Sequence, residues 1–339
     1  MDPVTHALLG SATARIACAR PLGGAAWIPG ALGALLPDAD ALIRSGSDPL
    51  LYAELHRHFT HSLAFIPVGG TIAALPWLLV PGVRARWRWY WSATVAGYAT
   101  HGLLDASTTF GTTLLWPFSD MRVAWSWISI VDPLFTAILI VGVVAAVRWC
   151  SAWPGGVALA LCLTYLTAGA WQRARALDAQ TLVAASRGHH PVRGDVFPGF
   201  LTNIVWRSMY EADGILYMDR LRVPWSGVPT WRPATSVAAI GEDDLPADVQ
   251  RDPRLLRDFW RFHRFTGGWV ARSPREPALI GDARYSSLTD AFEPVWGIRF
   301  EPSASPPVEW VDRSSRRRVD VAELWSELRG RSLAFRPVP

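Results

Sequence analysis

Lysine is absent from this 339-residue sequence, and every one of its 33 basic residues is an arginine. The arginines are scattered along the whole chain, so we interpret the bias as genome composition and give it no functional weight. Cysteine is also scarce: the three cysteines are odd in number and lie among apolar residues. This argues against a disulfide framework and against a thiolate zinc cluster. Any metal site in this chain must therefore use nitrogen and oxygen ligands.

Charged residues make up only 18% of the chain, while 50% of it is hydrophobic. That composition is too apolar for a disordered protein and for a typical soluble one. The formal net charge of +4 is small beside the 33 basic and 29 acidic residues that produce it. Nothing in this balance indicates a nucleic-acid partner.

The few charges are unevenly distributed, and they divide the chain near residue 172. Residues 1–172 carry 9 arginines and 8 acidic residues, whereas residues 173–339 carry 24 arginines and 21 acidic residues. We therefore predict an all-α helical membrane domain over residues 1–172, followed by a soluble α+β domain over residues 173–339. The second domain is expected to act as a lid or a substrate-selecting module.

Two uncharged runs in the first half, residues 63–83 and 149–172, are long enough to cross a bilayer, since about 20 apolar residues span its hydrocarbon core. Shorter apolar runs at 21–37, 89–104 and 133–147 bring the expectation to four or five spans. Residues 2–20 are expected to form an additional N-terminal helix that is retained, because an acidic residue and a histidine precede its apolar run where a signal peptide has positive charge.

The sequence after Arg173 is rich in charge and punctuated by proline. Short apolar runs predict strands at 215–223 and 295–301, and amphipathic periodicity predicts helices at about 254–265 and 319–329. The histidines of this half, His189, His190 and His263, are expected to be surface or core residues rather than metal ligands.

Ionisable residues of the first half gather at the ends of the apolar runs. Such groups are costly in a membrane and usually face a site, a partner or water. If the spans alternate in direction, one face of the membrane receives all of the following: Asp2, His6, Asp38, Asp40, His56, His58, His61, His101, Asp105 and Asp132. This one-sided convergence predicts a shared site.

The spacing of these residues suits metal coordination. His101 and Asp105 stand at i and i+4, side by side on one helical face, while His61 with His56 or His58 supplies further nitrogens and Asp38 with Asp40 supplies oxygens. Imidazole and carboxylate together are ligands for Zn²⁺, Mn²⁺ or Fe. We predict a divalent metal, with zinc as the first choice. For any single pair, helix capping by the aspartate or a backbone-bonded histidine remains the alternative.

Four segments in order resemble the YdjM-type family of inner-membrane-associated, metal-dependent hydrolases: residues 1–8 (MDPVTHAL), 36–40 (LPDAD), 56–62 (HRHFTHS) and 101–118 (HGLLDASTTFG through LWPF). The resemblance covers about residues 1–172 and implies a membrane-embedded helical hydrolase. More distantly, the segments look like the helical zinc phospholipase C and single-strand nuclease group, in which such ligands hold a metal cluster.

Carried over residue by residue, the resemblance assigns the metal positions to His6, Asp38, Asp40, His56, His61, His101 and Asp105, with Arg57, Thr60 and Asp132 as supporting residues. His58 stands where the family usually has a small residue. The region after Arg173 is longer than in the short members of the family.

The function that these residues predict is hydrolysis of a phosphoester, such as a phospholipid or a lipid-linked phosphate, by metal-activated water. Asp132, or else Asp38 or Asp40, is expected to act as general base or to orient a ligand imidazole. Arg57 is expected to bind phosphate bidentately. Membrane lipids are thus the expected partners.

Two other functions stay open at this point. A divalent-metal transporter or metal-binding membrane protein would also carry His and Asp in its spans, but a transport site is expected near the bilayer midplane, whereas these residues lie at span ends. The second alternative is a scaffold protein whose polar groups only cap helices.

The arginines predict on which side of the membrane the site lies. Six of them fall on the face opposite the site, Arg15, Arg20, Arg84, Arg86, Arg88 and Arg148, against three in the short loops on its own face, Arg44, Arg57 and Arg122. Positive residues favour the cytoplasm. We therefore predict a protein integral to a bacterial-type inner membrane, with the metal site on its extracytoplasmic side.

Overall fold

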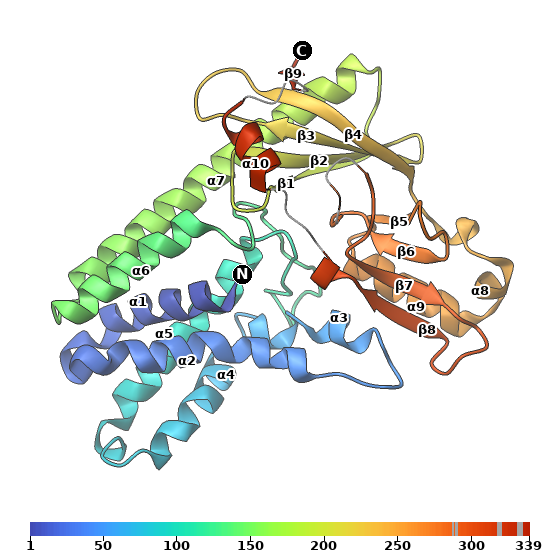
Figure 1. Ribbon diagram of the computed structural model, residues 1–339. Coiled ribbons are helices and arrows are strands. Elements are labelled where there is room, and N and C mark those ends of the chain that lie inside the picture. Colours follow the sequence, from blue (N-terminus) through green and yellow to red (C-terminus); the bar gives the residue numbers. More distant parts are fainter. Residues whose placement is uncertain (287, 289–290, 317–320, 331–334) are drawn as a thin grey trace. The chain divides into compact units, whose positions relative to one another are not determined.

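The computed structural model describes residues 1–286, 288, 291–316, 321–330 and 335–339. Its chain forms two compact units (Figure 1). The helical unit contains Met1–Ile43, Leu55–Trp171 and Phe200–Asn203, and the sheet unit contains Arg44–Glu54, Gln172–Gly199 and Ile204–Pro339. The division at Trp171 and Gln172 falls inside one continuous helix, α7 (Trp153–Ser186).

The helical unit is built from α-helices joined by short 3₁₀ helices. The α-helices are α1 (Pro3–Leu22), α2 (Trp27–Leu35), α4 (Ile66–Ala74), α5 (Trp87–Ala106), α6 (Pro133–Arg148) and the first part of α7, while α3 (Leu51–Leu55) leads back into the unit. The 3₁₀ helices are η1 (Gly23–Ala26), η2 (Leu36–Leu42), η3 (Phe59–His61), η4 (Leu75–Leu79) and η5 (Arg84–Arg86).

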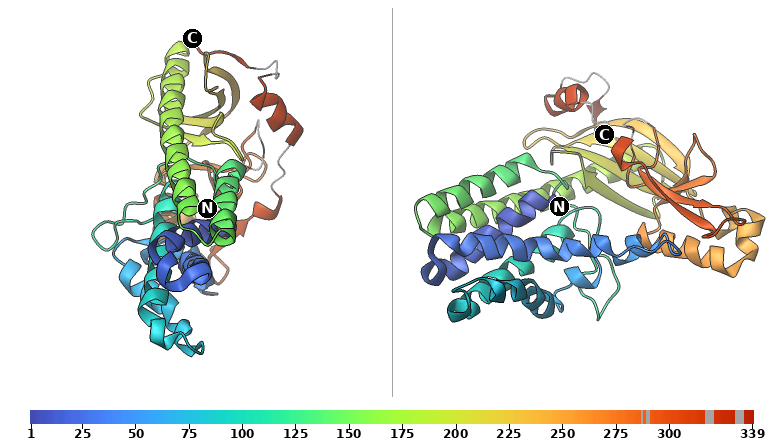
Figure 2. Two further views of the ribbon diagram at one scale, coloured as in Figure 1. Left: turned by 90° about the vertical axis from the view of Figure 1, so that its left-hand side faces the viewer. Right: turned by 60° about the horizontal axis from the view of Figure 1, so that its bottom comes forward.

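Helices α1, α2 and α5 pack with their backbones in close approach (Figures 1 and 2). A Cβ atom at Gly30 would overlap the backbone of Gly10, and one at Gly97 would overlap the carbonyl of Gly30. Only glycine fits at such crossings, and small residues at helix interfaces are a recurring device of membrane proteins. Beside them, Phe135 and Leu139 of α6 and Cys162 of α7 complete a buried core.

The structure corrects the expected number of membrane spans. Among the described residues, only α7 qualifies as a single spanning helix by length and composition. The pair Leu51–His61 and Ile66–Leu79 is bent by 90°, so it counts as one broken span at most. The helix of the apolar run 63–83 begins only at Ile66, with Pro67 in its first turn, and changes at Pro76 into the 3₁₀ helix η4, which ends at Leu79. Likewise α2 has nine residues and is about 14 Å long, less than half of the roughly 30 Å hydrocarbon core. One or two candidate spans replace the predicted four or five.

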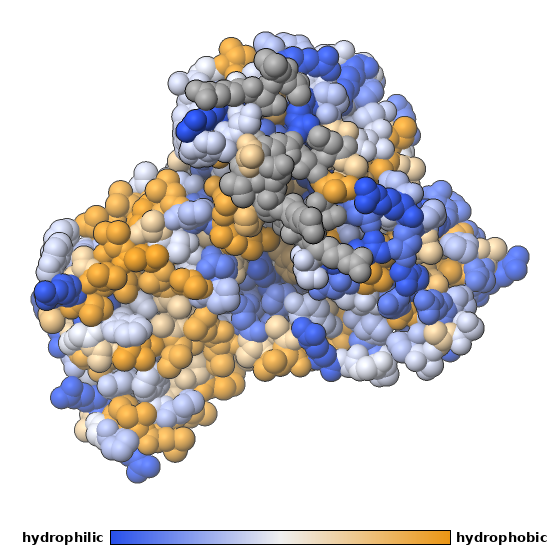
Figure 3. Space-filling view, viewed as in Figure 1, coloured by the Kyte–Doolittle hydropathy of each residue, from blue (hydrophilic) through white to orange (hydrophobic). Residues whose placement is uncertain are grey.

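Large apolar side chains nevertheless cover much of the face of the helical unit that Figure 3 shows. Exposed examples are Val68 and Ile72 on α4, Val141 on α6 and Leu161 and Leu163 on α7. An exposed apolar patch of this kind is typical of a surface that meets lipid or a partner. The short helices thus keep an apolar exterior although most of them cannot cross a bilayer singly.

The described residues of the sheet unit form two antiparallel sheets (Figure 1). The first has the order β1 (Arg193–Pro198), β2 (Val205–Ala212), β3 (Ile215–Arg222), β4 (Thr230–Ala238) and β9 (Arg336–Pro337). The second has the order β5 (Val270–Arg272), β6 (Leu279–Asp282), β7 (Trp296–Phe300) and β8 (Val308–Asp312). Asp213 and Gly214, both with positive φ, form the two-residue turn between β2 and β3, as expected for an Asp-Gly hairpin.

Helices cover both sheets. The C-terminal part of α7 packs Ala179 and Val183 against Trp206 and Leu221 of the first sheet. Helices α8 (Ala247–Arg251) and α9 (Pro253–Phe265) precede the second sheet, and α10 (Val321–Leu328) follows it. Phe262 of α9 contacts Trp310 of β8 edge to face.

The elements predicted in this half correspond to β3, β7, α9 and α10. Residues 319 and 320 of the last predicted helix lie outside the described residues. A helical first half followed by a sheet-rich second half is therefore confirmed, and the number of spans is the part of the prediction that was wrong.

Candidate metal centre

Three elements of the helical unit bring the predicted ligands together. Pro37 starts the 3₁₀ helix η2, which carries Asp38 and Asp40. His61 ends η3, and His101 and Asp105 occupy successive turns of α5. Because i and i+4 residues share one face of a helix, the last two point the same way, as the sequence predicts.

Four ligand atoms converge on one point. Nε2 of His61 lies 3.5 Å from Oδ1 of Asp38 and 3.4 Å from Oδ2 of Asp105. Nε2 of His101 lies 3.4 Å and 3.5 Å from the same two oxygens, and all four atoms lie within 4.8 Å of one another. Ligands about 2.0–2.2 Å from a tetrahedral ion stand roughly 3.3–3.5 Å apart. The group thus has the spacing of a four-ligand metal site.

The hydrogen bonds behind the two imidazoles direct their lone pairs into this group. Nδ1 of His101 lies 2.5 Å from the carbonyl oxygen of Ala34, which can only accept a hydrogen bond. Nδ1 of His61 lies 3.1 Å from Oδ2 of Asp40. With the proton on Nδ1, the neutral ring offers the Nε2 lone pair, which is the usual arrangement of ligand histidines.

Three of the four converging atoms, Nε2 of His61, Nε2 of His101 and Oδ2 of Asp105, are buried and make no hydrogen bond within the described residues. Oδ2 of Asp105 has the Arg57 guanidinium as an ion-pair partner. A buried polar atom left in this state costs about 1–3 kcal/mol, and a cation at the centre would satisfy all three. The donor set therefore fits a divalent metal ion. The side chain of Asp38 is 29% exposed while the other three are fully buried, so the site opens on the side of Asp38.

Asp40 binds the ligand-bearing segments to one another. Its Oδ1 lies 2.8 Å from Nδ1 of His56, and its Oδ2 accepts hydrogen bonds from the Thr60 hydroxyl at 2.6 Å and from the Arg57 backbone N–H at 3.0 Å. With His61 this makes four partners for one buried carboxylate. Asp38, Asp40 and His56 also form a second group with ligand atoms within 4.8 Å.

The pKa values of the two η2 carboxyl groups are held low. Burial opposes ionisation of Asp38, but the imidazoles of His101 and His61 outweigh it, so the pKa of Asp38 lies well below its ordinary value. Burial likewise opposes ionisation of Asp40, and interactions with His56, His61 and Thr60 lower its pKa. Both groups are therefore anionic at neutral pH, which favours a bound cation.

Arg57 occupies a constrained position beside the cluster. Its φ of 62° lies in the left-handed region, which a non-glycine residue adopts only when its surroundings impose it. Its Nε lies 3.0 Å from Oδ2 of Asp105, its Nη1 donates to Oγ1 of Thr108 at 3.1 Å, and its guanidinium covers the ring of Phe110. These contacts commit much of the guanidinium to the protein itself.

The remaining predicted residues lie in different surroundings. Nε2 of His6 is 3.1 Å from Oδ1 of Asp105, and its ring stacks on His101. His58 packs on Phe59 and Trp116. Asp132 accepts the backbone N–H groups of Leu134 and Phe135 as the N-cap of α6, and its other oxygen accepts from the Tyr165 hydroxyl. No described contact joins Asp132 to the cluster.

Sequence reasoning missed several neighbours of the site. The Ala34 carbonyl and the Met1 amino group, which contacts Asp105, carry no side-chain signature. Thr108 and Phe110 lie inside the segment 101–118 that was singled out, so the run STTF was the available signal. Their roles as contacts of Arg57 depend on the tertiary structure.

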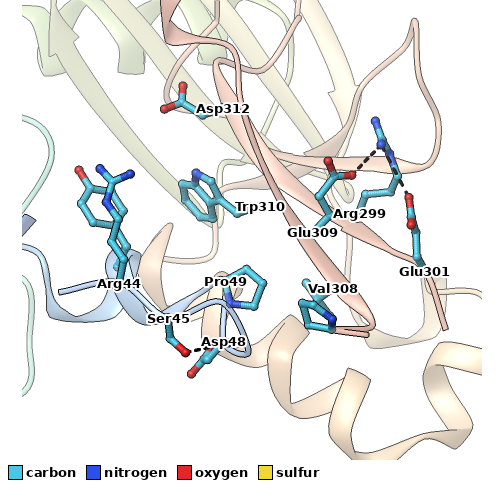
Figure 4. A pocket seen from close by; sticks show the side chains of 12 residues that line it. Arg44, Ser45, Asp48, Pro49, Arg299, Glu301, Val308, Glu309, Trp310 and Asp312 are labelled. Carbon is cyan, nitrogen blue, oxygen red and sulfur yellow. Dashed lines mark hydrogen bonds and ion pairs between the residues drawn. The ribbon is translucent and has the colours of Figure 1, made fainter. Parts of the chain in front are cut away.

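A pocket of about 630 Å³ forms a separate feature, within the sheet unit (Figure 4). One wall is the segment Arg44–Glu54, through Arg44 and Tyr52, and the other includes Trp310 and Asp312 of β8. None of the residues lining it belongs to the predicted metal set. The guanidinium of Arg44 lies over the ring of Tyr52.

Comparison with known proteins shows to which family the chain is related. The family model described as YdjM inner membrane protein matches residues 1–176, the region that holds every residue of the cluster. The chain belongs to the YdjM inner membrane protein family. The resemblance seen in the four motif segments is thereby confirmed, and the family is one of inner membrane proteins.

Two curated relatives are similar to parts of the chain. The uncharacterized protein YfhP of Bacillus subtilis (strain 168) is 30% identical over 141 residues, which are 39% of this chain and 42% of that protein. The inner membrane protein YbcI of Escherichia coli (strain K12) is 34% identical over 105 residues, 29% of this chain and 57% of that protein. The chain thus spans about half the length of the curated relatives it matches. No solved structure matches it.

Proposed function

We propose that this YdjM-family chain is a metal-dependent hydrolase whose divalent ion is held by Asp38, His61, His101 and Asp105. The observation that carries the proposal is the group of four ligand atoms, whose cross distances of 3.4–3.5 Å match tetrahedral coordination. Two imidazoles and two carboxylates favour zinc, and manganese or iron would use the same donors.

When bound there, zinc supplies Lewis acidity and lowers the pKa of a bound water from about 15.7 toward about 7. The chain's own residues set the geometry. Asp40 orients His61, the Ala34 carbonyl orients His101, and Arg57 balances the charge of Asp105. Such supporting groups fix the direction of each donor and are worth about 10–100-fold in metal affinity.

His56 is placed to move a proton. Its Nδ1 is paired with Asp40 at 2.8 Å, its side chain is 15% exposed, and it belongs to the group with Asp38 at the open side of the site. A carboxylate behind Nδ1 leaves Nε2 as the atom that exchanges a proton with a substrate or leaving group. We therefore assign proton transfer to His56 rather than to Asp132, whose contacts are those of a helix cap.

The substrate class that we propose is a phosphoester, such as a phospholipid or a lipid-linked phosphate. Membership of an inner membrane family and the apolar surface of the helical unit support a substrate that is met at a membrane. Arg57 is held by Asp105 and Thr108, so its proposed contribution to phosphate binding comes from its charge beside the metal rather than from a free bidentate fork.

The test is metal analysis and hydrolysis by the full chain purified in detergent. We expect about one tightly bound divalent ion per chain. We also expect cleavage of a phosphodiester or phosphomonoester that stops on chelation and returns when metal is added back. Metal binding without hydrolysis of phosphate or acyl esters would instead favour the metal-binding membrane protein considered above. A chain that binds no metal overturns the proposal.

A further inference from the structure

Between two groups of site residues, the chain leaves the helical unit. Asp38 and Asp40 belong to the helical unit, the inserted segment Arg44–Glu54 belongs to the sheet unit, and the chain returns to the helical unit at Leu55, directly before His56. The residues on either side of the inserted segment, Asp40 and His56, are in contact at 2.8 Å. Both ends of the inserted segment therefore lead directly into the candidate metal centre.

One arginine of α9 holds the inserted segment within the sheet unit. Arg261 donates from Nε and Nη2 to the two carboxylate oxygens of Glu54, at 2.8 and 2.6 Å. It donates from Nη1 and Nη2 to the two oxygens of Asp48, at 2.9 and 2.8 Å, and from Nη1 to Asp258 at 3.0 Å. A guanidinium has five N–H donors, and all five are used here.

The bonds of Arg261 are charge-assisted hydrogen bonds, and Arg261 itself belongs to a well-packed helix. Both oxygens of each segment carboxylate are engaged, which gives the pairing geometric specificity as well as strength. The Arg261 side chain is 16% exposed, so solvent screens the pairs less than it screens a surface ion pair. Helix α9 is itself fixed by the buried Phe259 and Phe262. The inserted segment is therefore tied to a packed helix.

We propose that Arg261 is a positioning residue for the metal centre, acting through Asp48 and Glu54 of the inserted segment. This inference rests on the proposed function, because it requires the centre to bind metal. Glu54 precedes His56 by two residues and Arg57, with its left-handed backbone, by three. Holding the segment restricts the backbone that leads into His56, Arg57 and His61.

Holding the inserted segment should strengthen metal binding because it lowers the conformational entropy that binding has to remove. A loosely held segment must be ordered when metal binds, and the free energy of that ordering is subtracted from the binding free energy. A segment already held by Arg261 has lost that freedom during folding. Lysine replaces the arginine only in part, since an ammonium group keeps the charge but lacks the planar fork that engages two carboxylates at once.

The experiment measures zinc affinity by chelator competition, on the full chain in detergent, for Arg261→Gln and Arg261→Lys. We expect zinc binding about tenfold weaker in Arg261→Gln, with Arg261→Lys between this variant and the unaltered chain. The matched control is Arg284→Gln. Arg284 pairs with both oxygens of Asp282 inside the sheet unit, at 3.0 and 2.8 Å, and Asp282 lies outside the inserted segment, so we expect an unchanged zinc affinity.

A second measurement separates positioning from loss of folding. The double variant Glu54→Gln, Arg261→Gln should bind zinc no more weakly than Arg261→Gln alone, because residues that act through one contact are not additive. If Arg261→Gln does not fold, Arg261→Lys and Asp48→Asn give the same comparison. Equal losses in the Arg261 and Arg284 variants, or additive losses in the double variant, overturn the inference.

The unaltered chain distinguishes this inference from the proposed function. Zinc binding that is unchanged by Arg261→Gln overturns the positioning role and leaves the metal centre intact. Failure of the unaltered chain to bind zinc or another divalent ion overturns the proposed function, and the positioning role with it.

Discussion

Nδ1 of His101 donates a hydrogen bond to the carbonyl oxygen of Ala34, 2.5 Å away, and so joins α5 to the end of α2. Asp38 follows Ala34 by four residues, in the 3₁₀ helix that continues α2. One backbone carbonyl therefore fixes the ring of one predicted ligand beside the segment that carries another. The predictions below test the centre that this contact helps to build.

Removing a predicted ligand should remove the metal. His101→Ala and Asp105→Ala each delete one of the four converging atoms, so we expect the metal content of the purified chain to fall well below that of the unaltered protein. Elemental analysis measures it. His58→Ala is the matched control, because His58 packs on aromatic rings and should keep the full metal content. Equal metal in all three variants would rule out the assignment.

Asp40→Asn should weaken metal binding without abolishing it. The substitution removes the negative charge behind His61 and His56 while keeping the shape of the side chain. We expect an affinity about 10–100-fold lower, as for other groups that orient a ligand imidazole, measured by competition with a chelator. Asp120→Asn changes an exposed aspartate of the same unit and should have no effect. Complete loss of metal would instead make Asp40 a direct ligand, as the sequence first predicted.

Gly102→Ala should disturb the centre from outside the ligand set. A Cβ at Gly102 would overlap the backbone carbonyl of His61, so either η3 or α5 must move and the two ligand rings must separate. We expect a loss of stability of about 1–3 kcal/mol, typical of overpacking, together with reduced metal content. Gly24→Ala meets no atom within 4 Å and is the control. Thermal unfolding and metal analysis of the two variants give the comparison.

Asp132→Ala separates a helix cap from a catalytic group. Its carboxylate accepts two backbone N–H groups at the start of α6 and the Tyr165 hydroxyl, so we expect a stability loss of about 1 kcal/mol with unchanged metal content and unchanged hydrolysis. The measurements are a melting temperature and the activity assay. Lost activity at normal stability would restore Asp132 to the catalytic role predicted from the sequence.

The side of the membrane on which the centre lies can be tested by reporter fusions at Pro339. The arginine count from the sequence assigned faces by four or five alternating spans, whereas the described helices offer one or two candidate spans. Arg15 is also fully buried and bonded to the carbonyls of Ala146 and Ser151, so the fusions test the predicted side independently of that count. We expect an active phosphatase fusion and a dark cytoplasmic fluorescent fusion. The reverse pattern would invert the topology while leaving the centre in place.

The sequence by itself determined the family, the change from a helical to a sheet-rich half and the residue types of the centre. These features are local. The i, i+4 spacing of His101 and Asp105 acts within one helix, the amphipathic pattern of 254–265 needs only its own periodicity, and each motif segment is contiguous. Apolar composition likewise set the first half apart, but the length of the apolar run 63–83 did not show that its helix begins at Ile66 and becomes a 3₁₀ helix at Pro76.

The tertiary structure alone decided which of the seven predicted ligands meet at one point and which support them. Asp38 and Asp40 are two residues apart in the sequence, yet Asp38 lies against the Nε2 atoms of His61 and His101, and Asp40 lies behind Nδ1 of His61. Spacing cannot separate these roles, because they depend on the close approach of η3 and α5 that Gly102 permits and on a backbone carbonyl without side-chain chemistry. The hold of Arg261 on residues 48 and 54 is equally invisible in the sequence, since more than 200 residues separate the charges that only folding brings together.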